Sequence, residues 1–290
     1  MHRLPTAASA GPDDDPGLAR DLELIDQRMR ERRRALTWIL SGGVAALVGA
    51  CGGGDGSSGT ASTTTTTADS ACVADPEETN GPFPADGTNS VDGSVVNVLT
   101  QSGIVRSDIT SSFGTSTTTA PGVPLTLTIS LEDPGNSCGL LSGYAIYIWH
   151  CNRDGEYSLY ASDLLDENYL RGVQVTDSGG EVTFKTIFPA CYSGRYPHIH
   201  VEVYASLASA TGQANAVLTT QLAMPRDVCE TVYGSATGYS DSTANLAAVT
   251  TSSDLVFASS SSAQLAAQTP TLSGSVSDGY TATVAVGVDV

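Results

Sequence analysis

The stretch Leu125-Thr126-Leu127-Thr128-Ile129-Ser130-Leu131 places an apolar side chain at every second position and a small polar side chain between them. Successive side chains of a β-strand point to opposite faces, so this run predicts a strand with one buried face and one wet face. An amphipathic helix would need apolar residues three or four positions apart. The stretch therefore favours β-structure for the surrounding chain.

The same alternation recurs along the chain from about residue 76 onward. The alternating runs are residues 145–149, 182–188, 199–203 and 280–288, and turn sequences rich in Asp, Gly and Pro lie at 133–136, 153–155 and 177–180. Many short strands separated by turns are typical of an antiparallel sandwich. We therefore predict an all-β fold, an antiparallel β-sandwich with long loops, in which residues 205–223 and 241–250 are the candidates for short helices.

The N-terminal part of the chain has a different composition. Residues 1–51 contain Arg32-Arg33-Arg34, a mostly apolar run over residues 35–50, and Cys51. This order is typical of a secretory signal, and about 16 apolar residues are fewer than the roughly 20 that span a bilayer. The twin arginines resemble a bacterial Tat signal, and Val48-Gly49-Ala50-Cys51 resembles a lipobox, which implies a lipid anchor on Cys51. An uncleaved signal anchor is the alternative, and residues 1–27 indicate no role.

Two further segments complete the domain organisation. Residues 52–75 are predicted to form a linker, because the chain up to Ser70 has no large apolar residue to bury. Residues 76–290 remain as the folded domain. We expect an exported bacterial protein, held at the cell envelope as a lipoprotein or secreted.

The net charge limits the classes of partner. The formal net charge is -18, and residues 1–51 contain as many arginines as acidic residues, so the whole excess lies after residue 51. Such a surface repels nucleic acid and anionic lipid. We expect no nucleic-acid partner, and contact with a membrane only through Cys51.

The cysteines after Cys51 are odd in number. They are Cys72, Cys138, Cys151, Cys191 and Cys229. An exported protein can form disulfides, so one or two bridges and at least one free thiol are expected, with the pairing left open. No CxxC spacing is present, which makes a thiolate zinc site unexpected.

Three histidines lie after the leader: His150, His198 and His200. His198 and His200 are two positions apart in a strand-like run, so both imidazoles point to the same face and can chelate one metal ion. The alternative is an ordinary polar strand face. His150 follows Trp149 at a strand end, where a structural role is expected.

The segments around these histidines closely resemble the intradiol ring-cleavage dioxygenase family. Five motifs occur in the order of that family, at residues 78–83 (ETNGPF), 106–109 (RSDI), 149–158 (WHCNRDGEYS), 170–177 (LRGVQVTD) and 189–200 (PACYSGRYPHIH). Ordered matches of this kind are more specific than any one of them. The resemblance implies a Greek-key, prealbumin-like sandwich.

The resemblance also implies a metal centre. The family holds a non-haem ferric ion on two tyrosinates and two histidines, which by motif are Tyr157 and His198 as equatorial ligands and Tyr192 and His200 as axial ligands. This ligand set suits a hard ion that favours anionic oxygen and accepts imidazole. Arg195 matches the active-site arginine of the family.

The implied reaction is the cleavage of a small aromatic diol by O2 between its two hydroxylated carbons. The diol would displace Tyr192, and Arg195 would stabilise the negative charge that develops. Two alternatives are a non-catalytic envelope binding module on the same fold, and a zinc hydrolase or ferrous oxygenase that uses Glu202 or another acidic residue as a third ligand.

One motif departs from the family pattern. Short secreted members have Pro-Gly-Trp-Tyr where this chain has Pro189-Ala190-Cys191-Tyr192, so the wall beside Tyr192 is altered. The identity of the diol is therefore left open. The helical N-terminal region through which intracellular members dimerise is not evident, which leaves the oligomeric state open as well.

Overall fold

Strands make up most of the regular structure in the computed structural model, which describes residues 72–290. The strands are β1 (Asp86–Val91), β2 (Ser94–Asn97), β3 (Pro124–Asp133), β4 (Gly139–Leu140), β5 (Ala145–Trp149), β6 (Arg171–Val175), β7 (Glu181–Ile187), β8 (His198–Tyr204), β9 (Ala216–Ala223), β10 (Thr271–Ser275) and β11 (Gly279–Gly287). The helices are α2 (Arg226–Ser235), α3 (Ser242–Ala248) and α4 (Ser262–Ala267), with 3-10 turns at Pro134–Asn136, Leu207–Ser209, Gln213–Asn215 and Phe257–Ser259. The predicted all-β class with few short helices is confirmed.

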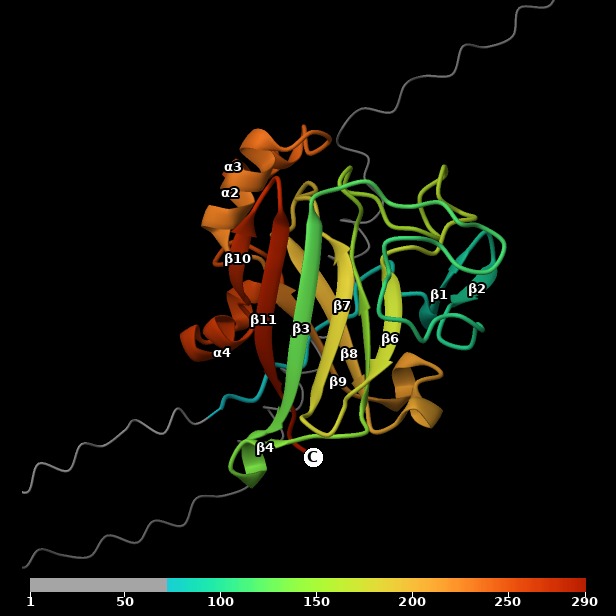
Figure 1. The fold of residues 1–290 in the computed structure, drawn as a ribbon, viewed down its shortest axis with the longest axis vertical. Helices are drawn as coiled ribbons and strands as arrows, with labels where there is room; N and C mark the ends of the chain where they lie inside the picture. The colour runs from blue at the N-terminus through green and yellow to red at the C-terminus, as the bar shows by residue number, and fades with distance from the viewer. Residues whose placement is uncertain (1–71) are drawn as a thin grey trace, which may run out of the picture.

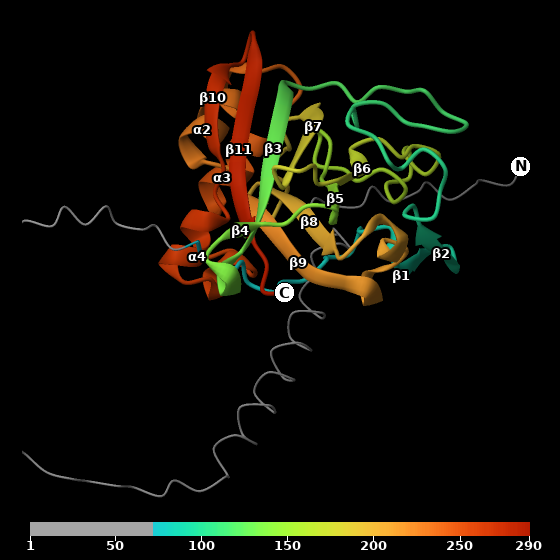
Figure 2. The same ribbon diagram turned by 60° about the horizontal axis from the view of Figure 1, so that its bottom comes forward.

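The strands form two sheets and a separate hairpin. The larger sheet has the order β10-β11-β3-β4, with β7 also paired to β3, the smaller sheet has the order β6-β5-β8-β9, and β1 pairs with β2. In Figure 1 the larger sheet lies in front of the smaller one. Both views place α2, α3 and α4 beside β10 and the β1–β2 hairpin on the opposite side of the molecule (Figures 1 and 2).

Strand β3 shows the burial that its sequence predicts. Its apolar residues, Leu125 to Leu131 at every second position, are buried, and the residues between them are only partly buried. The buried side chains join Ile199, Val201 and Val203 of β8 in one hydrophobic cluster. The core therefore lies between the two sheets, as alternation along both strands requires.

The larger sheet is not purely antiparallel, which corrects the sequence prediction. Strand β11 runs parallel to β3, with residues 280–287 in register with residues 125–132. Parallel neighbours need a long crossover connection, and here that connection includes every element from β4 to β10. The alternating pattern of a strand carries no information on the direction of its neighbour, so the sequence could not reveal this pairing.

The two central strands of the smaller sheet are buried on both faces, which corrects the expectation of one wet face. All five residues of β5 and all seven residues of β8 are buried. The outer face is covered by the segment 78–84. That segment is tied to the sheet by hydrogen bonds from Tyr147 Oη to the Pro84 carbonyl oxygen (2.7 Å) and from Gln221 Nε2 to the Thr79 carbonyl oxygen (3.0 Å).

The helix candidates were partly wrong. Residues 242–248 are helical, within the predicted 241–250. In contrast, residues 216–223 form strand β9, and only two 3-10 turns precede it in the predicted region 205–223. Helix α2 was not predicted. It buries only Cys229, Val232 and Tyr233, a stripe too short to stand out in the sequence.

One disulfide is present among the described residues. Cys72 is bonded to Cys138, and Cys151, Cys191 and Cys229 are free and buried. This outcome lies within the expectation of one or two bridges and at least one free thiol. The bridge joins the chain before β1 to the turn between β3 and β4.

The predictions for residues 1–51, including the signal and the anchor at Cys51, and for most of the linker lie outside the described residues. Among residues 72–290, no helix is both long and apolar enough to cross a membrane.

Candidate active site

Strand β8 places His198 and His200 side by side on the outer face of the smaller sheet. Both side chains are buried, and their Nε2 atoms are 3.1 Å apart. His200 of β8 is paired with Trp149 of the neighbouring strand β5. Their two rings stack, with centroids 4.6 Å apart and an interplanar angle of 4°. Strand alternation and this stacking together fix the direction of the two imidazoles.

The second nitrogen of His198 has a defined role. Its Nδ1 lies 2.6 Å from the carbonyl oxygen of Tyr196, which can only accept, so Nδ1 carries the proton and Nε2 offers its lone pair. Burial lowers the pKa of His198 to about 3, and burial followed by the charge on His198 lowers the pKa of His200 well below its usual value. Both imidazoles are therefore neutral at pH 7, as metal ligands must be.

A tight turn delivers Tyr157 to the same place. Asn152 Oδ1 accepts hydrogen bonds from the backbone N–H groups of Asp154 and Glu156, each at 2.9 Å, which reverses the chain after β5. Tyr157 follows this turn and is buried, with its hydroxyl oxygen 3.4 Å from Nε2 of His198 and 3.3 Å from Nε2 of His200.

Tyr192 approaches from the loop between β7 and β8. Its hydroxyl oxygen lies 3.3 Å from Nε2 of His198, and its side chain is only partly buried. A Cβ atom at Gly155 would lie 3.1 Å from Tyr192 Cβ, and Gly155 has a φ of 87°, so a glycine is required for the two loops to approach. The structure thus brings together all four residues that the sequence analysis proposes as ligands.

The four ligand atoms fit a single metal ion. Two ligands bound at right angles, each about 2.1 Å from an ion, are about 3 Å apart, close to the distances of 3.1 to 3.4 Å seen here. Phenol oxygens and imidazole nitrogens together suit iron. Burial raises the pKa of Tyr157 well above its ordinary value, so the protein alone keeps this phenol protonated and a nearby positive charge is needed to ionise it.

One other group of possible metal ligands occurs within residues 72–290: Cys72, Glu132 and Cys138. The two cysteines form the disulfide, so their sulfur atoms are not available as thiolates.

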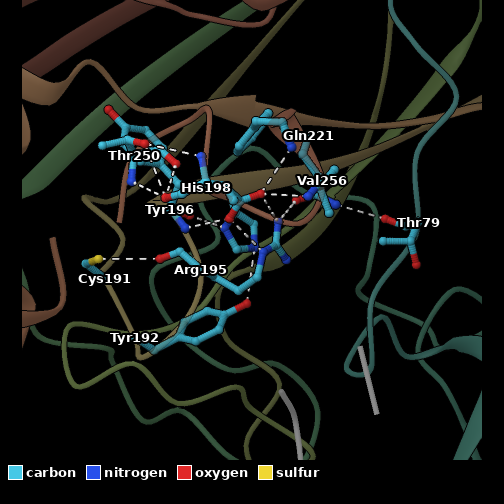
Figure 3. A network of polar contacts seen from close by, with 12 residues as sticks. Thr79, Cys191, Tyr192, Arg195, Tyr196, His198, Gln221, Thr250 and Val256 are labelled. Carbon is cyan, nitrogen blue, oxygen red and sulfur yellow. Dashed lines mark hydrogen bonds and ion pairs between the residues drawn. The ribbon is translucent and has the colours of Figure 1, made fainter. Parts of the chain in front are cut away.

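Arg195 is fully buried behind the tyrosine and histidine cluster. Its Nε donates to Asp254 Oδ2 at 3.0 Å. Its Nη2 donates to Gln221 Oε1 at 2.7 Å (Figure 3). Asp254 and Gln221 were not identified from the sequence. In the sequence, Asp254 stands shortly before the residues that form the 3-10 turn Phe257–Ser259. An acidic residue at such a position indicates at most a cap for that turn, not a partner of Arg195.

The remaining candidates have other partners. His150 points to the opposite face, where Nε2 lies 2.7 Å from Thr186 Oγ1 and Nδ1 lies 2.8 Å from the Cys151 carbonyl oxygen. Glu202 accepts a 2.6 Å hydrogen bond from Tyr204 Oη, and its pKa is raised by burial and by the nearby Asp86. Neither side chain makes a hydrogen bond to the four-residue cluster, which weakens the alternative of Glu202 as a third ligand.

Comparison with known proteins identifies similar sequences and folds. Residues 111–229 match the family model described as Dioxygenase. Chlorocatechol 1,2-dioxygenase of Rhodococcus opacus is 27% identical in a match covering 29% of this chain and 44% of the relative, so the chain spans less than half the length of that relative. The intradiol ring-cleavage dioxygenase from Tetranychus urticae superposes with a TM-score of 0.55 at 22% identity, over 75% of this chain and 95% of that chain. The structural likeness shows a shared fold.

Proposed function

We propose that this chain is a non-haem iron(III) enzyme that cleaves a catechol-type ring with O2. The match of residues 111–229 to the dioxygenase family, and the fold shared with an intradiol ring-cleavage dioxygenase, support this proposal. The observation that carries the proposal is the convergence of two phenol oxygens and two imidazole nitrogens, in which each phenol oxygen lies 3.3 to 3.4 Å from at least one imidazole nitrogen and the two nitrogens are 3.1 Å apart. A structural sandwich without chemistry has no need for such a cluster, because buried polar groups are costly unless they find partners.

The ligand residues would be Tyr157, Tyr192, His198 and His200. A bound ferric ion would supply a Lewis acid that favours the ionised forms of the two phenols and of the diol. Tyr157 and His200 are held firmly, because Tyr157 is buried against the ring of Phe83 (5.1 Å between centroids) and His200 is stacked on Trp149. These apolar neighbours also limit access of water to the cluster.

Tyr192 and Arg195 would carry the catalytic roles. Tyr192 is partly exposed and its phenol oxygen lies 3.3 Å from Nε2 of His198, which suits it to give way to a diol and to accept the proton from one diol hydroxyl. The guanidinium of Arg195 offers a permanent positive charge against the negative charge that develops on the ring.

The Greek-key arrangement and the cellular location belong to the same proposal. The strand order β6-β5-β8-β9 and the fold shared with the dioxygenase from Tetranychus urticae support a Greek-key sandwich. The arginines at 32–34 and Cys51 support an exported lipoprotein of the bacterial envelope. Replacing Cys51 by Ser should release the protein from the membrane fraction, and continued membrane association of that variant would refute the lipid anchor.

The visible spectrum of the purified, iron-loaded protein tests the proposed function. Tyrosinate bound to Fe(III) is coloured, whereas zinc sites are not, so the protein should show a visible band that changes when catechol is added in the absence of O2. Admission of O2 should then be followed by consumption of one O2 for each catechol. A colourless protein would point to another metal, and a coloured protein without oxygen consumption would point to a binding module.

A further inference from the structure

We infer that Asp254 is a positioning residue for Arg195: its buried carboxylate fixes the guanidinium beside the tyrosine and histidine cluster. The inference rests on the proposed function, because it assigns Arg195 a place in that reaction. Asp254 lies outside the residues that match the dioxygenase family and outside every motif found in the sequence.

Both oxygens of the Asp254 carboxylate accept hydrogen bonds. Oδ2 accepts from Arg195 Nε at 3.0 Å and from the backbone N–H of Tyr196 at 2.7 Å. Oδ1 accepts from the backbone N–H groups of Val256 (2.9 Å) and Phe257 (3.1 Å), and lies 3.5 Å from Arg195 Nη2. The side chains of Asp254 and Arg195 are both 0% exposed. The backbone of its own turn therefore orients this carboxylate toward Arg195.

The guanidinium is held from a second direction as well. Arg195 Nη2 donates to Gln221 Oε1 at 2.7 Å, and Gln221 is oriented in turn by donating to the carbonyl oxygen of Thr79 at 3.0 Å. Figure 3 shows Arg195 within this network, with Tyr192 reaching toward it and toward His198. An anion on one side and an amide on the other leave the guanidinium a single orientation.

The positive charge of Arg195 acts electrostatically on Tyr157, His198 and His200. Burial is the main influence on the pKa values of Tyr157, His198 and His200, and the charge of Arg195 acts on each of them in addition. Burial alone would raise the pKa of Asp254, but the charge of Arg195 and hydrogen bonds lower it below its usual value, so Asp254 stays an anion. A buried ion pair adds little net stability on average, which makes positioning the better account of this one.

Asp254 also contacts the backbone that orients a proposed metal ligand. It accepts from the N–H of Tyr196, and the carbonyl oxygen of the same residue accepts from His198 Nδ1. A test must therefore separate an effect on Arg195 from an effect on the metal site. Iron content and the visible band report the metal site, while kcat reports Arg195.

The substitution Asp254→Asn keeps the shape of the side chain and removes its charge. We expect this variant to bind iron and show the visible band as the unaltered protein does, and to lose about 10- to 100-fold in kcat through misplacement of the guanidinium. Asp133→Asn is the matched control, because Asp133 is buried in the larger sheet and should leave kcat unchanged. Loss of iron from Asp254→Asn in proportion to the loss of activity would overturn the assignment.

A double-mutant cycle tests whether Asp254 acts through Arg195. In an Arg195→Met background, Asp254→Asn should change kcat by less than about twofold, since no guanidinium remains to be placed. The same fold-loss in both backgrounds would show that Asp254 acts independently and would overturn the inference.

A measurement on the iron-free, full-length protein keeps the inference testable without activity. The Nε–H of Arg195, identified by its disappearance from the 15N spectrum in Arg195→Lys, should exchange slowly with solvent in the unaltered protein and in Asp133→Asn, and quickly in Asp254→Asn. Slow exchange in all three would overturn the inference. If the protein never consumes O2 with a catechol, the proposed function fails, and this exchange rate alone decides whether Asp254 holds Arg195.

Discussion

The two tyrosines of the cluster differ in burial and in contacts. Tyr157 is 3% exposed and its hydroxyl oxygen lies 3.3 to 3.4 Å from both histidines, whereas Tyr192 is partly exposed and its hydroxyl oxygen lies 3.3 Å from His198. The more enclosed residue suits a permanent ligand, and the more exposed one suits a ligand that leaves when the diol arrives.

Phenylalanine substitutions should therefore separate the two roles. Tyr157→Phe should weaken the resting ferric site and its colour, since an anionic ligand is lost. Tyr192→Phe should keep the colour that arises from Tyr157 and still bind catechol, with kcat lowered by about 100-fold as the proton acceptor is lost. Catechol titrations of the visible band and oxygen consumption measure both effects.

Tyr160→Phe is the matched control for these variants. Tyr160 also packs against Phe83 (5.1 Å between centroids), but its hydroxyl interacts with the backbone of Ala85 and with Asn89 instead of the histidines. It should keep both colour and turnover. Full turnover by Tyr192→Phe, or identical spectra for the Tyr157 and Tyr192 variants, would contradict the division of roles.

His150 provides a contrast with His198 and His200, the two proposed ligand histidines. Its ring bridges the sheets through Thr186, and burial lowers its pKa to about 4, so it is a neutral structural group at pH 7. His150→Ala should keep iron and colour and lower the free energy of unfolding by about 2 to 4 kcal/mol, through a cavity and an unpaired hydroxyl. Urea unfolding and iron analysis measure the two effects. Bleaching by His150→Ala but not by His200→Ala would contradict the ligand assignment.

Sequence motifs identify residues that are close along the chain, and this limit explains which site residues were found. Tyr192, Arg195, His198 and His200 lie within nine residues, and Tyr157 lies in a second short motif. Gln221 and Asp254 are 26 and 59 positions from Arg195. Nothing in the local sequence of Gln221 or Asp254 indicates a guanidinium partner, so only the folded chain could reveal them.

At the scale of elements, alternation predicted the strands and not their surroundings. The sequence of β8 reads as a half-buried strand, but His198, His200 and Glu202 on its polar face are as fully buried as Ile199 and Val201. The difference arises because segment 78–84 and the loop around Tyr157 cover that face. Polar residues that are covered in this way can form a binding or catalytic site. The alternating sequence alone does not distinguish such a covered polar face from one that is exposed to solvent.

The disulfide is the element-scale feature with a clear stability effect. Cys72 and Cys138 are separated by 66 positions, so the bond removes much freedom from the unfolded chain. Cys138→Ser should lower the free energy of unfolding by about 2 to 4 kcal/mol in non-reducing buffer and leave the visible band intact. Reductant should bring the unaltered protein to the value of the variant. Equal stability of the two proteins without reductant would contradict the bridge.

At the scale of the whole molecule, two buried carboxyl groups near the start of the described residues, Asp75 and Glu78, are expected to make the free energy of unfolding depend on pH. Burial raises the pKa of Asp75 from 3.8 to about 7 and that of Glu78 from 4.5 to about 8. Because both folded-state pKa values lie above the unfolded-state values, their contribution to stability is complete below about pH 4 and is lost as the pH rises through 7 to 8.

Asp75→Asn should flatten this profile. Asp75 Oδ2 accepts from the backbone N–H of Gly287 at 2.7 Å, which an asparagine oxygen can also do without a charge. We expect the unaltered protein to lose roughly 2 kcal/mol or more of unfolding free energy between pH 5 and pH 8, and the variant to lose clearly less. Urea unfolding at both pH values is the measurement. Parallel profiles for the two proteins would show that Asp75 does not titrate in this range.

The parallel pairing of β11 with β3 affects how the chain folds while it is being synthesised. A ribosome that adds about 5 to 20 residues each second needs on the order of ten seconds to proceed from β3 to the end of β11. Throughout this interval the edge of β3 that faces β11 has no partner, and unpaired apolar strands associate readily with other chains. The larger sheet is thus completed only after synthesis has passed Gly287, so nascent chains paused before Gly279 should depend on chaperones far more than the finished protein does.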